Sequence, residues 1–302
     1  MWSRIVTRHF RFALIFAAAL LVQLDSARGE GGGAPETAGP LFVIEGLSGP
    51  EAVHYDAEQD VYFVSNFNGD AAGDANGFIS RVGPDGEIET REFMVGTPDF
   101  PLHGPRGMRI VDELLWVADA DGLHAFDRRS GKHLDFIDFS GHAPGFLNDV
   151  EADPAGALYL TDTGNARLFR IVDGQITVLA AAELESPPNG IVWYSAAEAF
   201  VLAPWGGGLE LKAWRPATGE LVELGRLPEG GNIDGLEEYD GRLIVASQVD
   251  QSIWSWRAGE AVKLFDTPGR PADIGIDSRR GRVAIPYIVL DRVEIWALPE
   301  KQ

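Results

Sequence analysis

The chain contains no cysteine among its 302 residues. Disulfides and a lipoprotein anchor attached through cysteine are therefore excluded, so stability must come from core burial or from a bound ion. Long apolar runs are nearly absent as well. The one example, residues 12–24, covers about half to two-thirds of the roughly 20 residues that cross a bilayer. After residue 40, no segment keeps a helical period over three turns, which argues for an all-β chain.

Positive charge is scarce. The chain has 25 Lys and Arg against 46 Asp and Glu, a formal net charge of −21. Residues 1–29 hold four Arg and one Asp, so without them the balance is 21 against 45, or −24. Nucleic acid is a poor partner for such a surface, because binding depends on neutralising phosphates with basic side chains. Solubility explains most of this charge, and attraction of cations is a smaller consequence.

The N-terminus has the pattern of a secretory signal. Arg4, Arg8 and Arg11 precede the apolar run, and small residues follow it at Ala27 and Gly29. We predict a signal peptide over residues 1–29, with an uncleaved membrane anchor as the alternative. Residues 30–40 are rich in Gly and Pro and form a flexible linker. The mature protein, residues 41–302 behind that linker, is then exported to the periplasm or secreted, with no membrane attachment.

The remaining chain repeats a unit of short apolar strands separated by turn signals such as Asp153-Pro154-Ala155-Gly156 and Tyr239-Asp240-Gly241. Each unit has about forty residues and four strands, which is typical of propeller blades. The sequence therefore predicts a six-bladed β-propeller with four antiparallel strands per blade. The predicted blades begin near Glu51, Arg106, Asn148, Asn189, Asp234 and Asp273, at spacings of 55, 42, 41, 45 and 39 residues.

Residues 41–45 precede the first blade and are expected to pair with residues 293–297, closing the ring without a free sheet edge. Two rival architectures are a pair of β-sandwiches and a seven-bladed ring. Sandwiches would not repeat in register, and a seventh blade has no residues left to form it.

Oxygen donors recur at the blade starts. In a propeller the first strand of each blade lines the central channel, so these starts converge at one face. Four of the six matched positions are Glu51, Asn148, Asn189 and Asp234, whose hard oxygen ligands suit calcium or magnesium. The alternative is that each is a turn residue bonding nearby backbone.

Glu51 and Asp234, ionised together in a narrow channel, would need a counter-charge. The sequence therefore predicts one divalent cation at the channel floor, with calcium favoured and other divalent ions possible. Without cysteine, and with no two histidines at ligand spacing, a soft-metal site is not expected.

Four short motifs resemble those of the senescence marker protein/gluconolactonase (regucalcin-like) family of calcium-dependent six-bladed propellers. More distantly, they are similar to diisopropylfluorophosphatase and strictosidine synthase. The resemblance covers residues 41–298. The motifs are Ser48-Gly49-Pro50-Glu51-Ala52-Val53, Phe146-Leu147-Asn148-Asp149, Pro188-Asn189-Gly190 and Ile233-Asp234-Gly235.

This resemblance implies that Glu51, Asn148, Asn189 and Asp234 surround one calcium ion, with Asp234 as general base or nucleophile. The chain departs from the family pattern at residues 283–291. It also carries Arg106 and Asp273 at the other two blade starts. The departures leave the shared metal intact and leave the substrate open.

Two functions from different classes fit these observations. One is a metal-dependent hydrolase of small-molecule lactones, other esters or phosphotriester-like compounds. The other is a non-enzymatic exported propeller that binds a ligand or protein partner and uses the ion as a structural pin. Candidate residues of a pocket wall near the ion are Arg106, Asp273, Trp205, Tyr287 and His103.

Overall fold

The structure is a computed structural model, and it describes residues 39–299 except residue 72, residues 180–183 and residue 185. The chain divides into two units, Met1–Ala38 and Gly39–Gln302. The predicted signal peptide and most of the predicted linker lie outside the described residues and stay predictions. Within the described part, no helix has the length and apolar character needed to cross a membrane.

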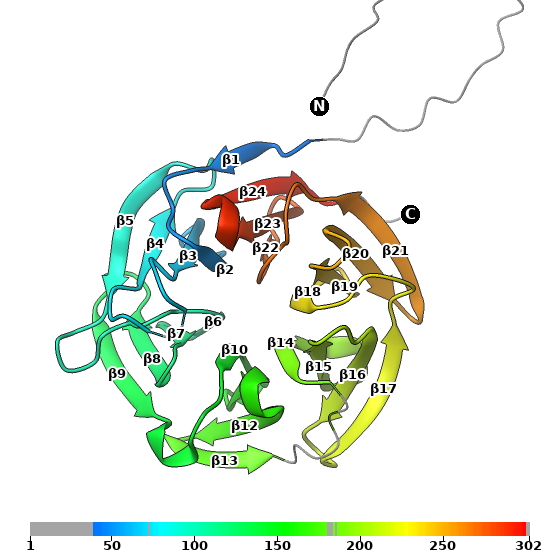
Figure 1. The fold of residues 1–302 in the computed structure, drawn as a ribbon, viewed down its shortest axis with the longest axis horizontal. Coiled ribbons are helices and arrows are strands. Elements are labelled where there is room, and N and C mark those ends of the chain that lie inside the picture. Colours follow the sequence, from blue (N-terminus) through cyan, green and yellow to red (C-terminus); the bar gives the residue numbers. More distant parts are fainter. Residues whose placement is uncertain (1–38, 72, 180–183, 185, 300–302) are drawn as a thin grey trace, which may run out of the picture. The chain divides into compact units, whose positions relative to one another are not determined.

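The second unit is a ring of six four-stranded antiparallel sheets, as predicted (Figure 1). Each of the first five sheets uses four strands that follow one another along the chain. The first blade comprises β2 (Pro50–Asp56), β3 (Val61–Asn66), β4 (Phe78–Val82) and β5 (Ile88–Val95). The second comprises β6 (Met108–Val111), β7 (Leu114–Ala118), β8 (Gly122–Asp127) and β9 (His133–Asp138). The third comprises β10 (Leu147–Ala152), β11 (Leu158–Asp162), β12 (Arg167–Val172) and β13 (Gln175–Leu179).

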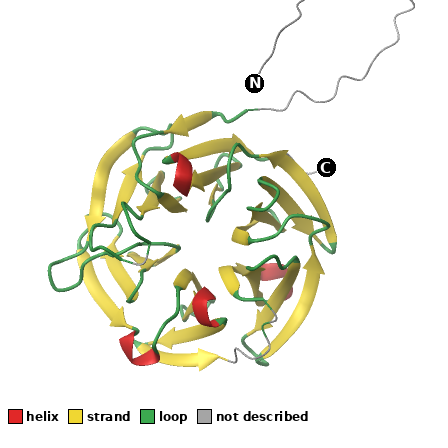
Figure 2. Ribbon diagram, viewed as in Figure 1, coloured by secondary structure: helices red, strands yellow, loops and turns green. Residues whose placement is uncertain are grey.

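The other half of the ring repeats this arrangement. The fourth blade comprises β14 (Pro188–Tyr194), β15 (Ala199–Pro204), β16 (Glu210–Arg215) and β17 (Glu220–Arg226). The fifth comprises β18 (Ile233–Tyr239), β19 (Arg242–Ser247), β20 (Ser252–Arg257) and β21 (Glu260–Asp266). Helix in the described residues is limited to four single 3-10 turns, drawn red in Figure 2. They are η1 (Ser140–His142), η2 (Thr163–Asn165), η3 (Ser195–Ala197) and η4 (Ile288–Leu290).

The sixth blade closes the ring with both ends of the chain. It contains β22 (Gly275–Asp277), β23 (Arg282–Tyr287), β24 (Arg292–Ala297) and the N-terminal strand β1 (Phe42–Ile44). Phe42 pairs with Ile295, and Ile44 pairs with Val293. The predicted closure of the last blade by the N-terminal strand is therefore confirmed.

Tight hairpins set the strand order within the blades. Between β18 and β19, Asp240 and Gly241 both have positive φ angles, 56° and 71°. Asp173 and Gly174 between β12 and β13 do the same, at 49° and 72°. Two consecutive left-handed residues make a type I′ turn, whose twist matches that of antiparallel strands. The Asp-Gly pairs in the sequence therefore specify these hairpins.

The hydrophobic core is divided among the blade interfaces. Six clusters of buried apolar side chains each join two neighbouring blades. One cluster brings Trp254 and Trp256 of the fifth blade against Val201 and Leu211 of the fourth. Apolar side chains fill the spaces between the sheets, and the innermost strands, β2, β6, β10, β14, β18 and β22, surround the centre of the ring (Figure 1).

Candidate functional site

The four predicted ion ligands occupy the same structural position in four blades. Pairing between the first and second strands breaks after Pro50, Leu147, Pro188 and Ile233, and resumes three residues later. In each blade the predicted ion ligand is the first residue of this unpaired segment. A β-bulge bends the strand and re-aims a side chain. Glu51, Asn148, Asn189 and Asp234 are each only 4% exposed.

Neighbouring innermost strands approach closely at these bulges. The amide of Asp273 donates to the carbonyl of Glu51 at 2.9 Å. A Cβ placed on Gly190 would lie 2.4 Å from the backbone oxygen of Asp234, and one on Gly235 would lie 2.4 Å from the amide nitrogen of Ile274. Glycine therefore follows Asn189 and Asp234 because the next blade leaves no room for a side chain.

Hydrogen bonds orient the two asparagines and the aspartate. The side-chain amide of Asn148 donates to the Thr163 hydroxyl at 3.1 Å. Asp234 accepts from the side-chain amides of Gln248 and Asn189. Since both asparagines use their amide nitrogens in these bonds, their carbonyl oxygens are the atoms left to hold a cation.

Glu51 is the least satisfied member of the group. Its Oε2 atom is buried and has no hydrogen-bond partner among the described residues. Burial raises the pKa of Glu51 well above its usual range, the Asp234 carboxylate raises it further, and Arg106 partly offsets both. Burial likewise raises the pKa of Asp234 to about 7. A buried, unpaired carboxylate oxygen beside another carboxylate fits a site for a hard cation.

Carboxyl groups outnumber guanidinium groups in the part of the channel that the structure describes. Arg106 and Arg109 are the two guanidinium groups that act on the channel carboxylates. Burial lowers the pKa of His54 to about 3, so this side chain is neutral. Burial is also the main cause of the raised pKa of each channel carboxyl group. These groups are Glu51, Asp149, Glu151, Asp234, Glu237 and Asp273.

Arg106, one of the predicted wall residues, presents free donors in a buried position. It is 1% exposed, and its guanidinium lies 4.0 Å from the centroid of the Phe146 ring. Nη2 donates to the carbonyl of Ala71, in the loop between β3 and β4, while Nε and Nη1 have no partner among the described residues. Such donors can bind an anionic or carbonyl oxygen. Asp273, at the sixth blade start, is partly buried.

The other three predicted wall residues lie in different surroundings. Trp205 is partly buried, and its backbone amide donates to Pro187 at 2.8 Å. Tyr287 is 1% exposed in the core between the fifth and sixth blades, and its hydroxyl donates to Glu294 at 3.3 Å. That placement is a packing position and gives no support to a role in a pocket wall. His103 lies beside Asp121, with Nε2 3.7 Å from a carboxylate oxygen.

The opposite end of the channel opens into a cavity of about 950 Å³ that was not predicted from the sequence. Arg109 and Glu151 face it and form an ion pair of 2.7 Å. Glu237 also lines it, and burial raises the pKa of Glu237 to about 8. All three stand three residues after a blade start, so the same repeat register would have found them.

No protein-family model matches the sequence, and no curated protein matches it. Among solved structures, a gluconolactonase from Xanthomonas campestris has a TM-score of 0.64 at 16% identity, covering 85% of this chain and 88% of that one. A streptogramin B lyase has a TM-score of 0.61 at 15% identity, covering 84% and 96%. Virginiamycin B lyase from Staphylococcus aureus has a TM-score of 0.56 at 17% identity, covering 86% and 89%. These proteins are six-bladed β-propellers, and the likeness establishes the fold of this chain.

Proposed function

We propose that this protein is a calcium-dependent hydrolase of small lactones or other esters. Glu51, Asn148, Asn189 and Asp234 would hold the ion. One observation carries the proposal: four oxygen donors stand at the same bulge of four blades, and one of them, Glu51, has a buried carboxylate oxygen without a partner. Turn formation alone accounts for a polar residue in one blade, but not for a buried carboxyl oxygen without a partner in a channel whose carboxyl groups already outnumber its arginines.

The donor set suits calcium. All four ligands offer oxygen, and the channel carboxylates outnumber the two arginines. When bound, a calcium ion would polarise the ester carbonyl and stabilise negative charge on its oxygen. The gluconolactonase among the structural neighbours supports a lactone as the first substrate class to test.

Asp234 is the residue that we expect to act on the substrate, as general base on water or as nucleophile. The amides of Gln248 and Asn189 hold its carboxyl group in place. The pKa of Asp234 is about 7 in the ion-free site, and a bound calcium ion would lower it and keep the carboxylate ionised for either role. Arg106 would bind a substrate oxygen through its unpaired Nε and Nη1 donors.

Asp234→Asn tests this mechanism. The variant keeps the shape and one oxygen donor, so it should fold and bind calcium more weakly. At saturating calcium it should lose about 10²–10⁴-fold in ester or lactone turnover, the usual loss when general acid–base help is removed. Asp173→Asn, in an exposed hairpin turn with positive φ, is the matched control and should retain activity. Turnover that survives Asp234→Asn would make this residue a ligand only and would refute the mechanism.

The alternative is a binding propeller with a structural ion. Two observations favour it: the four donors are each 4% exposed, and the 950 Å³ cavity lies at the other end of the channel. A screen of lactones and aryl esters with and without chelator separates the two functions. Calcium-dependent turnover supports the hydrolase. Calcium-dependent thermal stability without any turnover supports the binding propeller.

We also propose that the protein works outside the cytoplasm after removal of residues 1–29. The basic start and the short apolar run support this assignment. The N-terminus of the mature protein can be determined by mass spectrometry. A mature chain that begins at Met1 would contradict cleavage.

A further inference from the structure

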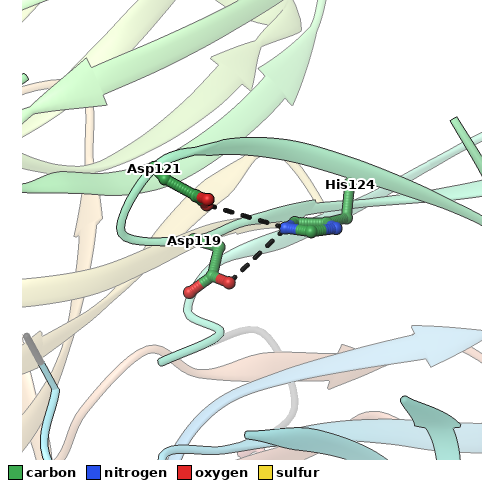
Figure 3. A group of neighbouring side chains, drawn as sticks. All are labelled: Asp119, Asp121 and His124. Atoms are coloured by element: carbon green, nitrogen blue, oxygen red, sulfur yellow. Dashed lines mark ion pairs between the residues drawn. The ribbon is translucent and has the colours of Figure 1, made fainter. Parts of the chain in front are cut away.

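Three ligand-type side chains gather at the turn between β7 and β8, in the second blade. Asp119 and Asp121 belong to the turn, and His124 lies within β8 (Figure 3). His124 Nε2 is 3.5 Å from Asp119 Oδ2 and 3.8 Å from Asp121 Oδ1. One ligand atom from each of the three residues lies within 4.8 Å of the others.

Two polar atoms of this cluster lack a hydrogen-bond partner among the described residues. His124 is 0% exposed, and neither its Nε2 nor Asp121 Oδ1 has a hydrogen-bond partner among the residues that the structure describes. Separations of 3.5 and 3.8 Å are too long for good hydrogen bonds. A neutral imidazole nitrogen directed between two carboxylates without bonding to them is unfavourable, whereas a cation bound between them, or a proton on the imidazole, satisfies all three groups.

The spacing fits a small cation. Oxygen and nitrogen ligands lie about 2.0–2.2 Å from a tetrahedral zinc ion, which places two ligand atoms about 3.3–3.6 Å from each other. The distances from His124 Nε2 to the two carboxylates are at or slightly beyond the upper end of that range. The three ligand atoms lie within 4.8 Å of one another, so binding of an ion would draw Asp121, at the tip of the turn, closer to the other two residues.

The surrounding residues fix two of the three side chains, His124 and Asp119. His124 Nδ1 lies 3.0 Å from His133 Nε2, and the His124 ring packs on Phe136 with centroids 4.6 Å apart. Asp119 Oδ1 accepts from the amide of Gly104 at 2.6 Å. Metal-bound histidines are usually held in this way by a hydrogen bond at the other ring nitrogen. The ligand atoms of these two residues are therefore already oriented.

We propose that Asp119, Asp121 and His124 bind a divalent transition-metal ion of the zinc class, separate from the channel site. His103, with Nε2 3.7 Å from Asp121 Oδ2, is placed to supply the fourth ligand. Imidazole with carboxylate favours zinc over calcium. No two histidines lie at ligand spacing in the sequence, so a soft-metal site was not expected. The hairpin instead joins one histidine to two aspartates.

An ion at this site would hold in place the segment that leads to Arg106. Asp119 receives the backbone amides of His103 and Gly104, each at 2.6 Å. His103 and Gly104 lead directly into Arg106, whose Nε and Nη1 have no partner among the described residues. An ion at Asp119 would therefore fix the segment that positions Arg106. This inference does not depend on the hydrolase proposal.

Zinc titration of tag-free, chelator-stripped protein by calorimetry tests the proposal. Excess calcium occupies the channel site, so the zinc taken up reports on the cluster of Asp119, Asp121 and His124. We expect one zinc ion per chain. Asp121→Asn should weaken zinc binding by about tenfold or more, as loss of a ligand charge does at such sites. Glu51→Gln and His142→Ala should leave it unchanged. Cobalt in place of zinc should give visible absorption bands of a tetrahedral nitrogen–oxygen site, and these should be lost in His124→Gln.

Three results would overturn the proposal. One is folded parent protein that takes up no zinc, which would mean that a proton on His124 fills the place of the ion. Another is uptake that Asp121→Asn and His124→Gln leave undiminished. The third is uptake that falls equally in His142→Ala, which would indicate adventitious binding. Circular dichroism verifies that each variant is folded, and Asp121→Asn, in a partly exposed turn, keeps the test valid if His124→Gln does not fold.

Discussion

Calcium affinity at the channel site should rise steeply between about pH 6 and pH 8, because calcium binds carboxylates only after they lose their protons. Burial raises the pKa of Asp234 to about 7, so the ion-free protein holds a proton there at neutral pH. The ionised fraction of such a group is about one-eleventh at pH 6 and about ten-elevenths at pH 8, a tenfold change in apparent affinity. The pKa of Glu51 is also raised well above its usual range, so a second proton competes with calcium and makes the rise in affinity steeper.

Calcium affinity rises with pH because the pKa values of Asp234 and Glu51 are both raised. A carboxyl group with a raised pKa keeps its proton to higher pH, so calcium must displace it, and affinity is lost as pH falls. Calorimetry in two buffers of different ionisation enthalpy counts the protons released on binding. Asp234→Asn should remove about tenfold of the pH dependence and leave the part due to Glu51. Affinity that is constant over this range would show that the carboxylates are already ionised without calcium, and the argument from excess buried charge would fail.

Three further predictions concern stability. Calcium at about 100 times its dissociation constant should stabilise the folded protein by about 2.7 kcal/mol, and equal melting temperatures with calcium and with chelator would contradict a bound ion. Gly190→Ala places a Cβ 2.4 Å from the backbone oxygen of Asp234, so urea unfolding should show a loss of about 1–3 kcal/mol. Gly141→Ala, with no atom within 4 Å of the new Cβ, should change stability by less than about 0.5 kcal/mol. Burial raises the pKa of Glu237 to about 8, so the folded protein binds a proton there that the unfolded chain has released, and stability falls as pH rises from the ordinary glutamate range toward 8. In calcium-free buffer, Glu237→Gln should reduce this fall, and identical pH profiles for parent and variant would refute it.

The fold could be predicted from the sequence because its signals are local and repeated. Each Asp-Gly turn specifies its own hairpin, as Asp240 and Gly241 do, and six repetitions make the blade count secure. Ring closure was predictable from a short apolar segment left over before the first blade, which pairs with β24. Glu51 and Asp234 were found because they stand at matched positions of the repeat.

The placement of individual side chains within a blade could not be predicted from the repeat. Tyr287 was expected in a pocket wall, but its hydroxyl reaches Glu294 on the adjacent strand of the same blade. The cluster of Asp119, Asp121 and His124 depends on a hairpin that brings residues five positions apart face to face. Nothing in the repeat marks it, because the other blades have no equivalent histidine.

The pairing of β1 with β24 has a consequence for how the protein is made. The ribosome delivers the N-terminal strand first and its partner roughly 250 residues later. At about 5–20 residues per second, a nascent chain waits between about 12 and 50 seconds before the last blade can be completed. During that time β1 is an unpaired edge, the kind of strand that recruits foreign strands, and its length of three residues limits that hazard. A chain released before β24 is made has no means of closing its ring.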